Sequence, residues 1–593
     1  MGIDVERQIT ADAACRIPLY VSAAIILLFI LWFAGSADKP LNLDNTDFPA
    51  AAERTAVTGV PVYYKGEEEP NSLGIYHPPL YIYLLAAWIN VFGFGEAQVR
   101  LFGMLCALLQ GAIVLAIIRT LFGSAFRWGP IFWAIFLLNP YTLQTAAITD
   151  IDSTIYGPLL CLVLLATLRI SWRDGEWRTD AVSWLEFASI GVAIFLCLWA
   201  KLTTVLLVFP VVFLLLIARK GIRQAALVAA AIEGASIVAF LASYYLYGAL
   251  VGLDVGVTFR FTLMVFYARG SSGTPGLAAL LRDHWNNLRA MVPFTMSWTG
   301  LLPWAAACLA LWVAFRAAIR QRDRRLLHYG LVLGLALLTT LCYCAQTMTF
   351  GSAPFKYTFV FWGLVLTAPL FLLARWTSPD PWQGSSRTVT AALLCVYIAA
   401  EVWANLRVGD SLMLNGFAGP YSLVAYIPAL LFVAALAATR YGRAGLAAPM
   451  AVLAVYCGLQ FGVAVYQEQA PYSTTYDYGQ MGFLDTVAFL KSNTRSNDVI
   501  AAMKDMGFRC RLRCFETYSA LTSGAGDPSV SRFMDAAASG RFAYIVFTEG
   551  RGQDQLVRNP ALRQWFLKRS TLVRSFGHYR IYQMDTRQHA AAR

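Results

Sequence analysis

Long uninterrupted apolar runs recur along this 593-residue chain and limit its possible folds more than any other feature. Most of them have roughly 17 to 25 residues, the length that an α-helix needs to cross a bilayer core of about 30 Å. Hydrophobic residues make up 58% of the sequence and charged residues only 14%, which argues against a set of soluble domains. The pattern predicts an all-α polytopic membrane protein.

Thirteen of these runs are predicted to be membrane spans. They are residues 17–34, 99–119, 129–147, 154–171, 184–200, 203–218, 224–246, 301–319, 327–346, 358–375, 388–405, 421–439 and 444–465. No small-residue cleavage site follows the first run, so we interpret it as an uncleaved anchor and not as a signal peptide.

One further apolar stretch, Pro78 to Gly93, determines which loops share a side of the membrane. If it does not cross, the N-terminal arm and the basic loops fall together, with 19 Lys and Arg in about 79 residues. The opposite loops then hold 10 in about 152 residues. The positive-inside rule therefore predicts a cytoplasmic N-terminus and an outward C-terminus, with residues 78–93 as an interfacial helix. The net charge of +12 is thus interpreted as a topology signal and not as a nucleic-acid surface.

The predicted chain has two parts. Residues 1–465 form the membrane domain, whose main outward loops are 35–98, 148–153, 247–300 and 347–357. Residues 466–593 have the pattern of a small α/β domain, with short helices and alternating strands. Its elements are expected at residues 483–493, 498–502, 531–539 and 543–548, with a hairpin formed by 572–576 and 579–584.

Carboxylates gather in two of the outward loops. Asp44 and Asp47 follow the first span in L-D-N-T-D-F, and Asp150 and Asp152 lie in the short loop T-D-I-D-S. Such residues can be solvated loop positions or helix caps. A D-x-D pair can also hold a divalent cation through its oxygens. The pattern alone leaves these alternatives open.

Three further polar positions lie at the predicted outer face. His77 precedes the interfacial helix and is a candidate metal ligand, phosphate contact or hydrogen-bonded interface residue. Lys201 falls in a two-residue break between apolar runs, and Lys356-Tyr357 begins another span. A lysine there can snorkel to the headgroups or bind the phosphate of a lipid.

Motifs for nucleotide cofactors are absent from the sequence. It has no G-x-x-x-x-G-K-S/T, no G-x-G-x-x-G after a predicted strand, no H-E-x-x-H and no nucleophile elbow. We therefore expect neither ATP nor NAD chemistry.

Together these residues resemble the GT-C superfamily of integral-membrane glycosyltransferases, and the likeness covers nearly the whole chain. The branch most similar contains protein O-mannosyltransferases and lipid A aminoarabinose transferases. The motifs that carry the resemblance are Asp44-Asn45-Thr46-Asp47-Phe48 with Gly59 fifteen residues after Asp44, and His-Pro-Pro-Leu-Tyr running to Phe92-Gly93 and Arg100-Leu101.

Other positions take their expected roles from the same resemblance. It implies that Asp44 and Asp152 are catalytic and that Lys201, Lys356 and Tyr357 contact the donor phosphate. Asp47, His77 and Asp150 are implied to orient the acceptor or to hold a divalent metal ion.

The resemblance also implies a reaction. The expected donor is a polyprenyl-phosphate-linked sugar, and the acceptor is a hydroxyl of a lipid, glycan or protein at the outer face of the bacterial inner membrane. A secondary transporter and a polysaccharide ligase or polymerase are the alternatives. Transporters usually show inverted repeats and midplane charges, whereas the notable charges here lie at the predicted outer face.

Cys510 and Cys514 stand in C-R-L-R-C within the tail. An outward tail meets an oxidising compartment, where disulfides persist. We therefore expect a local disulfide between them.

Replacing the expected general base should abolish most of the activity. Asp44→Asn removes the proton acceptor for the attacking hydroxyl, and general-base catalysis typically contributes about 10²–10⁴-fold. Sugar transfer by membranes containing the variant should fall by that factor. Full transfer activity in this variant would show that the assignment is wrong.

Overall fold

The structure is a computed structural model, and it divides into two compact units, residues 1–37, 100–250 and 255–469, and residues 38–99, 251–254 and 470–593. Residues 38–99, most of the segment predicted to be the first outer loop, are thus grouped with the C-terminal tail and not with the membrane helices. The residues that the structure describes are 19–35, 37, 40–41, 46–61, 77–122, 128–147, 149–173, 176–177, 183–260, 262, 281–282, 284–289, 302–321, 323–346, 361–376, 447–469, 481–517, 528–548 and 560–585.

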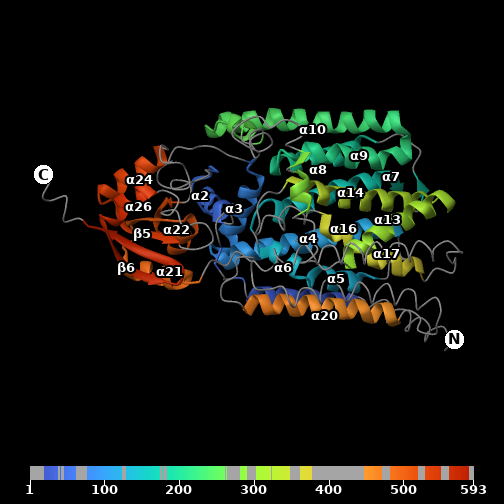
Figure 1. Ribbon diagram of the computed structural model, residues 1–593. Helices are drawn as coiled ribbons and strands as arrows, with labels where there is room; N and C mark the ends of the chain where they lie inside the picture. The colour runs from blue at the N-terminus through green and yellow to red at the C-terminus, as the bar shows by residue number, and fades with distance from the viewer. Residues whose placement is uncertain are drawn as a thin grey trace. The chain divides into compact units, whose positions relative to one another are not determined.

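The first unit is a bundle of helices (Figure 1). It begins with the helix Leu19–Gly35. A short antiparallel pair of strands, β1 (Trp172–Arg173) and β2 (Glu176–Trp177), lies between α7 and α8. The other helices are α4 (Glu96–Phe122), α5 (Gly129–Leu137), α6 (Pro140–Ala147), η3 (Asp152–Tyr156), α7 (Gly157–Ser171), α8 (Trp184–Ala200), α9 (Thr204–Lys220), α10 (Ile222–Val251), α13 (Leu302–Gln321), α14 (Arg324–Gln346), α16 (Trp362–Val365), α17 (Thr367–Trp376) and α20 (Ala447–Gln469).

Eleven of the thirteen predicted spans coincide with these helices, and the other two, 388–405 and 421–439, lie outside the described residues. Among the described helices, four are long and apolar enough to cross a membrane: α4, α10, α13 and α14. Two predicted spans are interrupted. The run 129–147 breaks between α5 and α6 ahead of Pro140, and 358–375 becomes α16 and α17. Proline cannot donate a helical hydrogen bond, which explains the first break.

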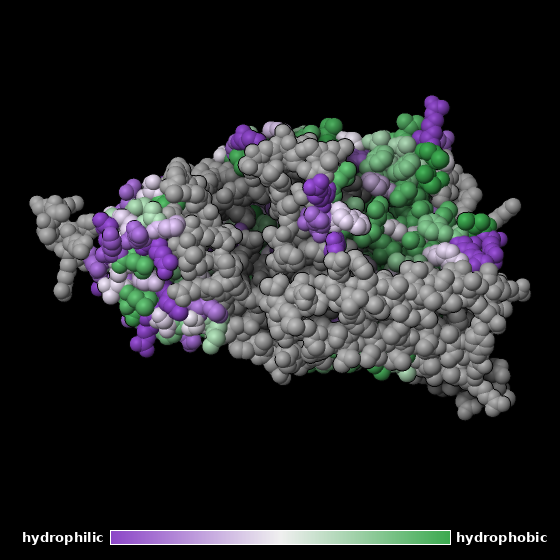
Figure 2. Space-filling view, in the orientation of Figure 1, coloured by the Kyte–Doolittle hydropathy of each residue, from purple (hydrophilic) through white to green (hydrophobic). Residues whose placement is uncertain are grey.

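The outer surface of the helices is apolar. Large hydrophobic side chains such as Leu227, Val238 and Leu250 of α10 are more than 60% exposed. Figure 2 shows hydrophobic residues over the helical unit and mostly hydrophilic ones on the C-terminal domain. An exposed apolar surface of this kind is what a helix bundle presents to lipid.

Close helix packing places the segment that carries Asp152. Gly103 of α4 lies so near α6 that a Cβ would stand 2.2 Å from the carbonyl oxygen of Ala146. Arg100, one turn earlier, is buried and donates to the carbonyl oxygens of Ala37 and Ala147 at 3.4 Å each. Small residues permit such backbone approach between membrane helices.

The C-terminal part of the second unit is an α/β domain with a five-stranded sheet of order β4-β3-β5-β7-β6. β3 pairs in parallel with β4 and β5, β7 pairs antiparallel with β5, and β6 and β7 form the predicted hairpin. The elements are α21 (Phe483–Asn493), β3 (Val499–Ala502), α22 (Lys504–Cys510), β4 (Arg513–Glu516), α24 (Pro528–Ala538), β5 (Phe542–Thr548), α26 (Pro560–Leu567), β6 (Ser570–Phe576) and β7 (Tyr579–Met584).

Helices cover both faces of this sheet. Phe533 of α24 and Phe566 of α26 pack into one core with strand residues such as Phe547. On the other face, α21 and α22 bury Leu490 and Met506 against Ile500 and the strands around it. The sheet is therefore the middle layer of three, and α22 is held firmly against it.

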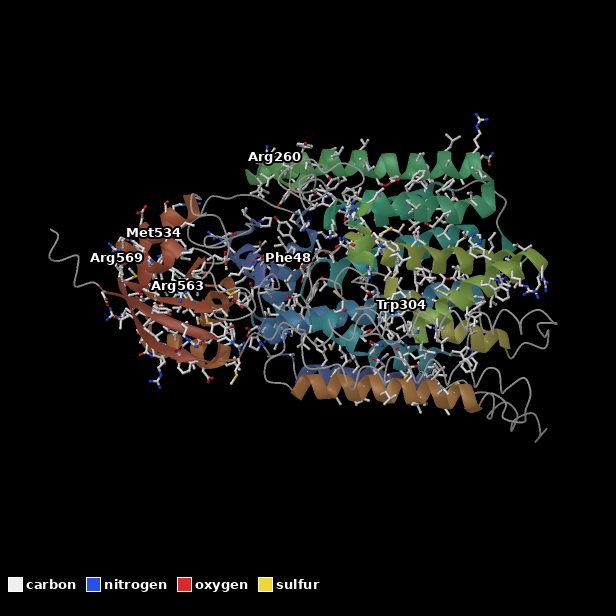
Figure 3. The ribbon with its side chains drawn as sticks, in the orientation of Figure 1. Phe48, Arg260, Trp304, Met534, Arg563 and Arg569 are labelled. Atoms are coloured by element: carbon white, nitrogen blue, oxygen red, sulfur yellow. The ribbon has the colours of Figure 1, made fainter. Side chains whose placement is uncertain are left out.

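Two helices from the first outer loop complete the second unit: α2 (Asp47–Thr58) and α3 (Leu80–Phe92). Phe48 of α2, labelled in Figure 3, meets the ring of Tyr81 of α3 at 5.1 Å between centroids. The hydroxyl of Tyr83 donates to the carbonyl oxygen of Gly59, which follows α2. α3 is the helix that the sequence predicted at residues 78–93. It has 13 residues, and at a rise of about 1.5 Å per residue it is too short to span a bilayer.

The contact at Gly103 gives a packing prediction with a matched control. Gly103→Ala should lower the free energy of unfolding by about 1–3 kcal/mol, because the methyl group must displace the backbone of Ala146. Gly234→Ala in α10 meets no atom within 4 Å and should be neutral or stabilising, as alanine is the better helix former. Thermal denaturation in detergent compares the two; equal stability of both variants would contradict this packing.

Candidate active site

A buried ion pair joins two of the residues that the sequence singled out. Lys201 Nζ lies 2.5 Å from Oδ1 and 2.6 Å from Oδ2 of Asp152. The two side chains are 9% and 3% exposed. Their positions are 49 residues apart in the chain, so the fold and not local sequence brings them together.

Asp152 is held by an unusual piece of helix. It begins η3, a five-residue π-helix that leads directly into α7. The side chain of Asp150 accepts a hydrogen bond from the backbone N–H of Asp152 at 3.2 Å, and its carbonyl oxygen accepts from the hydroxyl of Thr154 at 2.6 Å. Single π-helical turns occur frequently at functional sites. Asp150 shapes the turn, and Asp152 is aimed at Lys201.

Lys201 occupies the predicted break between two helices. α8 ends at Ala200, Lys201 is extended with φ −157° and ψ 130°, and α9 begins at Thr204. The break turns the lysine away from either helix axis. Its ammonium lies 5.8 Å from the ring centroid of Tyr156, the last residue of η3. Such a distance permits an attractive cation–π contact.

The start of α9 adds donors beside Lys201. The hydroxyl of Thr203 is buried and has no hydrogen-bond partner within the described part of the chain. Thr203 is also the N-cap of α9, without a side-chain capping bond. Helix N-termini carry unsatisfied N–H groups and a partial positive charge, which favours anions. Donors of this kind complement a phosphate.

The energetics of the pair are demanding. Removing one partner of a buried ion pair leaves an uncompensated charge, which typically costs about 3–5 kcal/mol. An anion beside Lys201 therefore stabilises its charged form. In the structure that anion is Asp152, and a phosphate group is a chemically equivalent replacement.

Aromatic side chains cluster around Trp199, two residues before Lys201. Its ring contacts Phe240, Tyr244 and Tyr247 of α10 at centroid distances of 5.4 to 6.0 Å. Its indole N–H donates to the hydroxyl of Ser243 at 3.2 Å. Trp199 and these three rings thus form an aromatic wall between α8 and α10.

The other predicted site residues are distributed as follows. Asp44, Lys356 and Tyr357 lie outside the described residues. Asp47 and His77 belong to the second unit. Asp47 pairs with Lys504 at 2.7 Å, and His77 stacks on Phe48 with centroids 6.3 Å apart. Among the residues that the structure describes, no three His, Cys, Asp or Glu side chains form a metal-binding group.

The predicted disulfide is absent: Cys510 and Cys514, both described, are free cysteines. Cys510 ends α22 and packs into the domain core, whereas the thiol of Cys514 on β4 turns toward the carbonyl oxygen of Ala502 on β3 at 3.6 Å. Burial raises the pKa of Cys510 to about 12 and the pKa of Cys514 well above its ordinary value. Protonated buried thiols of this kind are unreactive.

Sequence reasoning did not identify the partners of the first outer loop. Lys504, Arg509 and Arg511 pair with acidic residues of segment 38–99. The signal was present in K-D-M-G-F-R-C-R, a basic stretch in a domain whose role was unassigned. Nothing in that stretch indicates which distant carboxylates it contacts.

Comparison with known proteins agrees with the expected superfamily. A family model described as dolichyl-phosphate-mannose-protein mannosyltransferase matches residues 76–247. No curated protein matches the chain at the sequence level. ArnT from Cupriavidus metallidurans bound to undecaprenyl phosphate is similar in structure, with a TM-score of 0.58 and 16% identity over 94% of this chain and 97% of that one. The apo form gives a TM-score of 0.57 at 16% identity, over 97% and 98%.

The ion pair makes a prediction about stability that is independent of any activity. Lys201→Met should destabilise the protein by about 3–5 kcal/mol, because Asp152 then remains buried without a counter-charge. Adding Asp152→Leu should recover most of that loss. Thermal denaturation of both variants in detergent is the measurement; a single variant as stable as the wild type would exclude the buried pair.

Proposed function

Because the chain has the fold of the GT-C glycosyltransferases, we propose that it transfers a sugar from a polyprenyl-phosphate-linked donor to a hydroxyl acceptor. The observation that carries the proposal is the buried pair of Lys201 and Asp152 at a helix break. The match of residues 76–247 to a mannosyltransferase family model includes both residues. The structural likeness to an ArnT with bound undecaprenyl phosphate supports this class of donor.

The donor phosphate takes the place of Asp152 on Lys201. A phosphate arriving beside Lys201 offers the ammonium a replacement anion, and the displaced carboxylate of Asp152, which is buried as well, takes a hydrogen bond from the acceptor hydroxyl in place of the lysine. The hydroxyl of Thr203 and the N-terminus of α9 supply further donors to the phosphate oxygens. The aromatic wall around Trp199 fits the apolar chain of the lipid.

Transfer then breaks one bond and forms one. The acceptor oxygen attacks C1 of the sugar, and its proton passes to the carboxylate of Asp44. The bond from C1 to the phosphate oxygen breaks with its electron pair, and polyprenyl phosphate leaves. A single displacement inverts the configuration at C1. Lys201 stabilises the charge that grows on the phosphate, and electrostatic stabilisation of this kind is usually the largest contribution to catalysis.

The remaining predicted residues keep subsidiary roles. Lys356 and Tyr357 contact the donor phosphate, and His77, Asp47 and Asp150 orient the acceptor or hold a divalent metal ion. Asp152, once released from Lys201, accepts a hydrogen bond from the acceptor. The reaction takes place at the outer face of the bacterial inner membrane. The acceptor is a lipid, glycan or protein.

Two measurements on Lys201 test the function. Native mass spectrometry of the purified protein should detect bound undecaprenyl phosphate in the wild type, and Lys201→Met should weaken that binding at least ten-fold. Transfer from a panel of polyprenyl-phosphate sugars should fall about 10²–10³-fold, the usual loss when one group that stabilises the transition state is removed.

The matched control is Lys491→Met, at an exposed lysine of the C-terminal domain, which should behave as the wild type in both assays. Comparing cellular lipid A and glycan masses with and without the protein then identifies the acceptor. Binding of undecaprenyl phosphate that is equal in Lys201→Met and wild type would overturn the proposed phosphate site.

A further inference from the structure

Three ion pairs connect the C-terminal domain to the first outer loop. Lys504 Nζ lies 2.7 Å from Asp47 Oδ2, and Arg511 Nη1 lies 2.7 Å from each carboxylate oxygen of Glu53. All of the paired residues belong to one compact unit. The complete set is Lys504 with Asp47, Arg511 with Glu53, and Arg509 with Glu96.

An aromatic contact accompanies the three ion pairs. The ring of Phe508 meets that of Phe94 edge-on, with centroids 5.5 Å apart. The guanidinium of Arg511 lies 4.1 Å from the centroid of the same Phe94 ring. Phe94 lies between α3 and α4, so the contact reaches beyond α2 to a second part of the loop. A cation over an aromatic face is attracted to it in addition to its carboxylate.

Lys504 and Arg509 belong to α22, and Arg511 is the residue that directly follows this helix. α22 buries Met506 and Cys510 in the core of the C-terminal domain. A Cβ at Gly507 would lie 2.2 Å from Cβ of Cys514 on β4, so the helix is pressed against the strand. The side chains on its other face are therefore presented from a fixed element. We use the name basic clamp for Lys504, Arg509 and Arg511.

The carboxylates that pair with the basic clamp belong to helices of segment 38–99. Asp47 is the first residue of α2, three residues after Asp44 in the sequence. Its neighbour Phe48 packs against His77 and Tyr81. Glu96 is the first residue of α4. The basic clamp thus contacts the loop at the first residue of α2, within α2, and at the first residue of α4.

We infer that the C-terminal domain is a positioning element for this enzyme, and that the basic clamp holds the first outer loop in its reactive arrangement. The inference rests on the proposed function, because it concerns the loop to which Asp44 and His77 belong. Catalytic groups must be held close to their productive geometry, and a misplacement of about 1 Å can reduce the rate about 10²-fold. Lys504, Arg509 and Arg511 are positioning residues and touch no substrate.

The strength of the clamp fits such a role. Its side chains are partly exposed, and exposed ion pairs are individually weak and screened by salt. Three ion pairs and an aromatic contact together hold the loop. The C-terminal domain has two hydrophobic cores of its own, so its fold does not depend on the clamp. Reversing one charge replaces an attraction with a repulsion, so charge reversal tests the clamp more severely than removal.

The test exchanges the two charges of one pair. Arg511→Glu should lower kcat about ten-fold while KM for the donor changes less than about two-fold, and Glu53→Arg should behave similarly. The double variant Arg511→Glu/Glu53→Arg restores an opposite pair and should recover at least half of the wild-type kcat. A merely structural residue would change the thermal midpoint, which we expect to stay within a few degrees in all three proteins.

Hydrogen–deuterium exchange measures how firmly the clamp holds α2, without any assay of activity. Amides of residues 47–58 should exchange at least five-fold faster in Arg511→Glu, and the double variant should reverse the change. The matched control is Lys568→Glu, an exposed lysine just after α26, which should alter neither kcat nor exchange. Unchanged exchange and unchanged kcat in Arg511→Glu, or a double variant that recovers neither, would overturn the inference. If no polyprenyl-phosphate donor is used, the proposed function fails, and the exchange experiment still decides whether the clamp exists.

Discussion

A charge buried among membrane helices must carry its counter-charge with it, and this requirement governs the arrangement around Asp152 and Lys201. The hydrocarbon environment satisfies no polar group, so both residues lie where the helices break. One break is the π-helical turn before α7, and the other is the extended residue between α8 and α9. The close approach of α4 to α6 at Gly103 packs the segment immediately before that turn. Helix packing, local irregularity and charge pairing therefore depend on one another.

The two kinds of ion pair in the molecule serve different purposes. The pair of Lys201 and Asp152 is buried, so it is expensive to break and useful only if another anion can take over. The pairs of the basic clamp are partly exposed, so each is weak and easily re-formed. A phosphate competing for Lys201 exploits the first property. The weakness of the clamp pairs suits a loop that is held by several contacts, because one pair can break and re-form while the others keep the loop in position.

Sequence patterns predicted the helices well, and they singled out Asp152 and Lys201, which the structure brings together. Apolar runs gave eleven spans that coincide with helices, and alternation gave the β6–β7 hairpin, because both signals are local. Lys201 stood out as a charge at a helix break and Asp152 as part of a D-x-D pair. Their direct contact was not predictable, since it depends on how α7 and α8 pack. For the same reason the partners of Lys504 and Arg511 were missed. The disulfide expected between Cys510 and Cys514 rested on the predicted oxidising compartment, and both thiols are free.

The central claim is that a lipid phosphate replaces Asp152 as the partner of Lys201. A structure of the protein determined by electron cryomicroscopy with bound undecaprenyl phosphate tests it most directly. The account predicts Lys201 Nζ within about 3 Å of a phosphate oxygen, with Asp152 separated from the lysine and turned toward the acceptor side. A lipid phosphate bound elsewhere, with the pair of Lys201 and Asp152 intact, would contradict it.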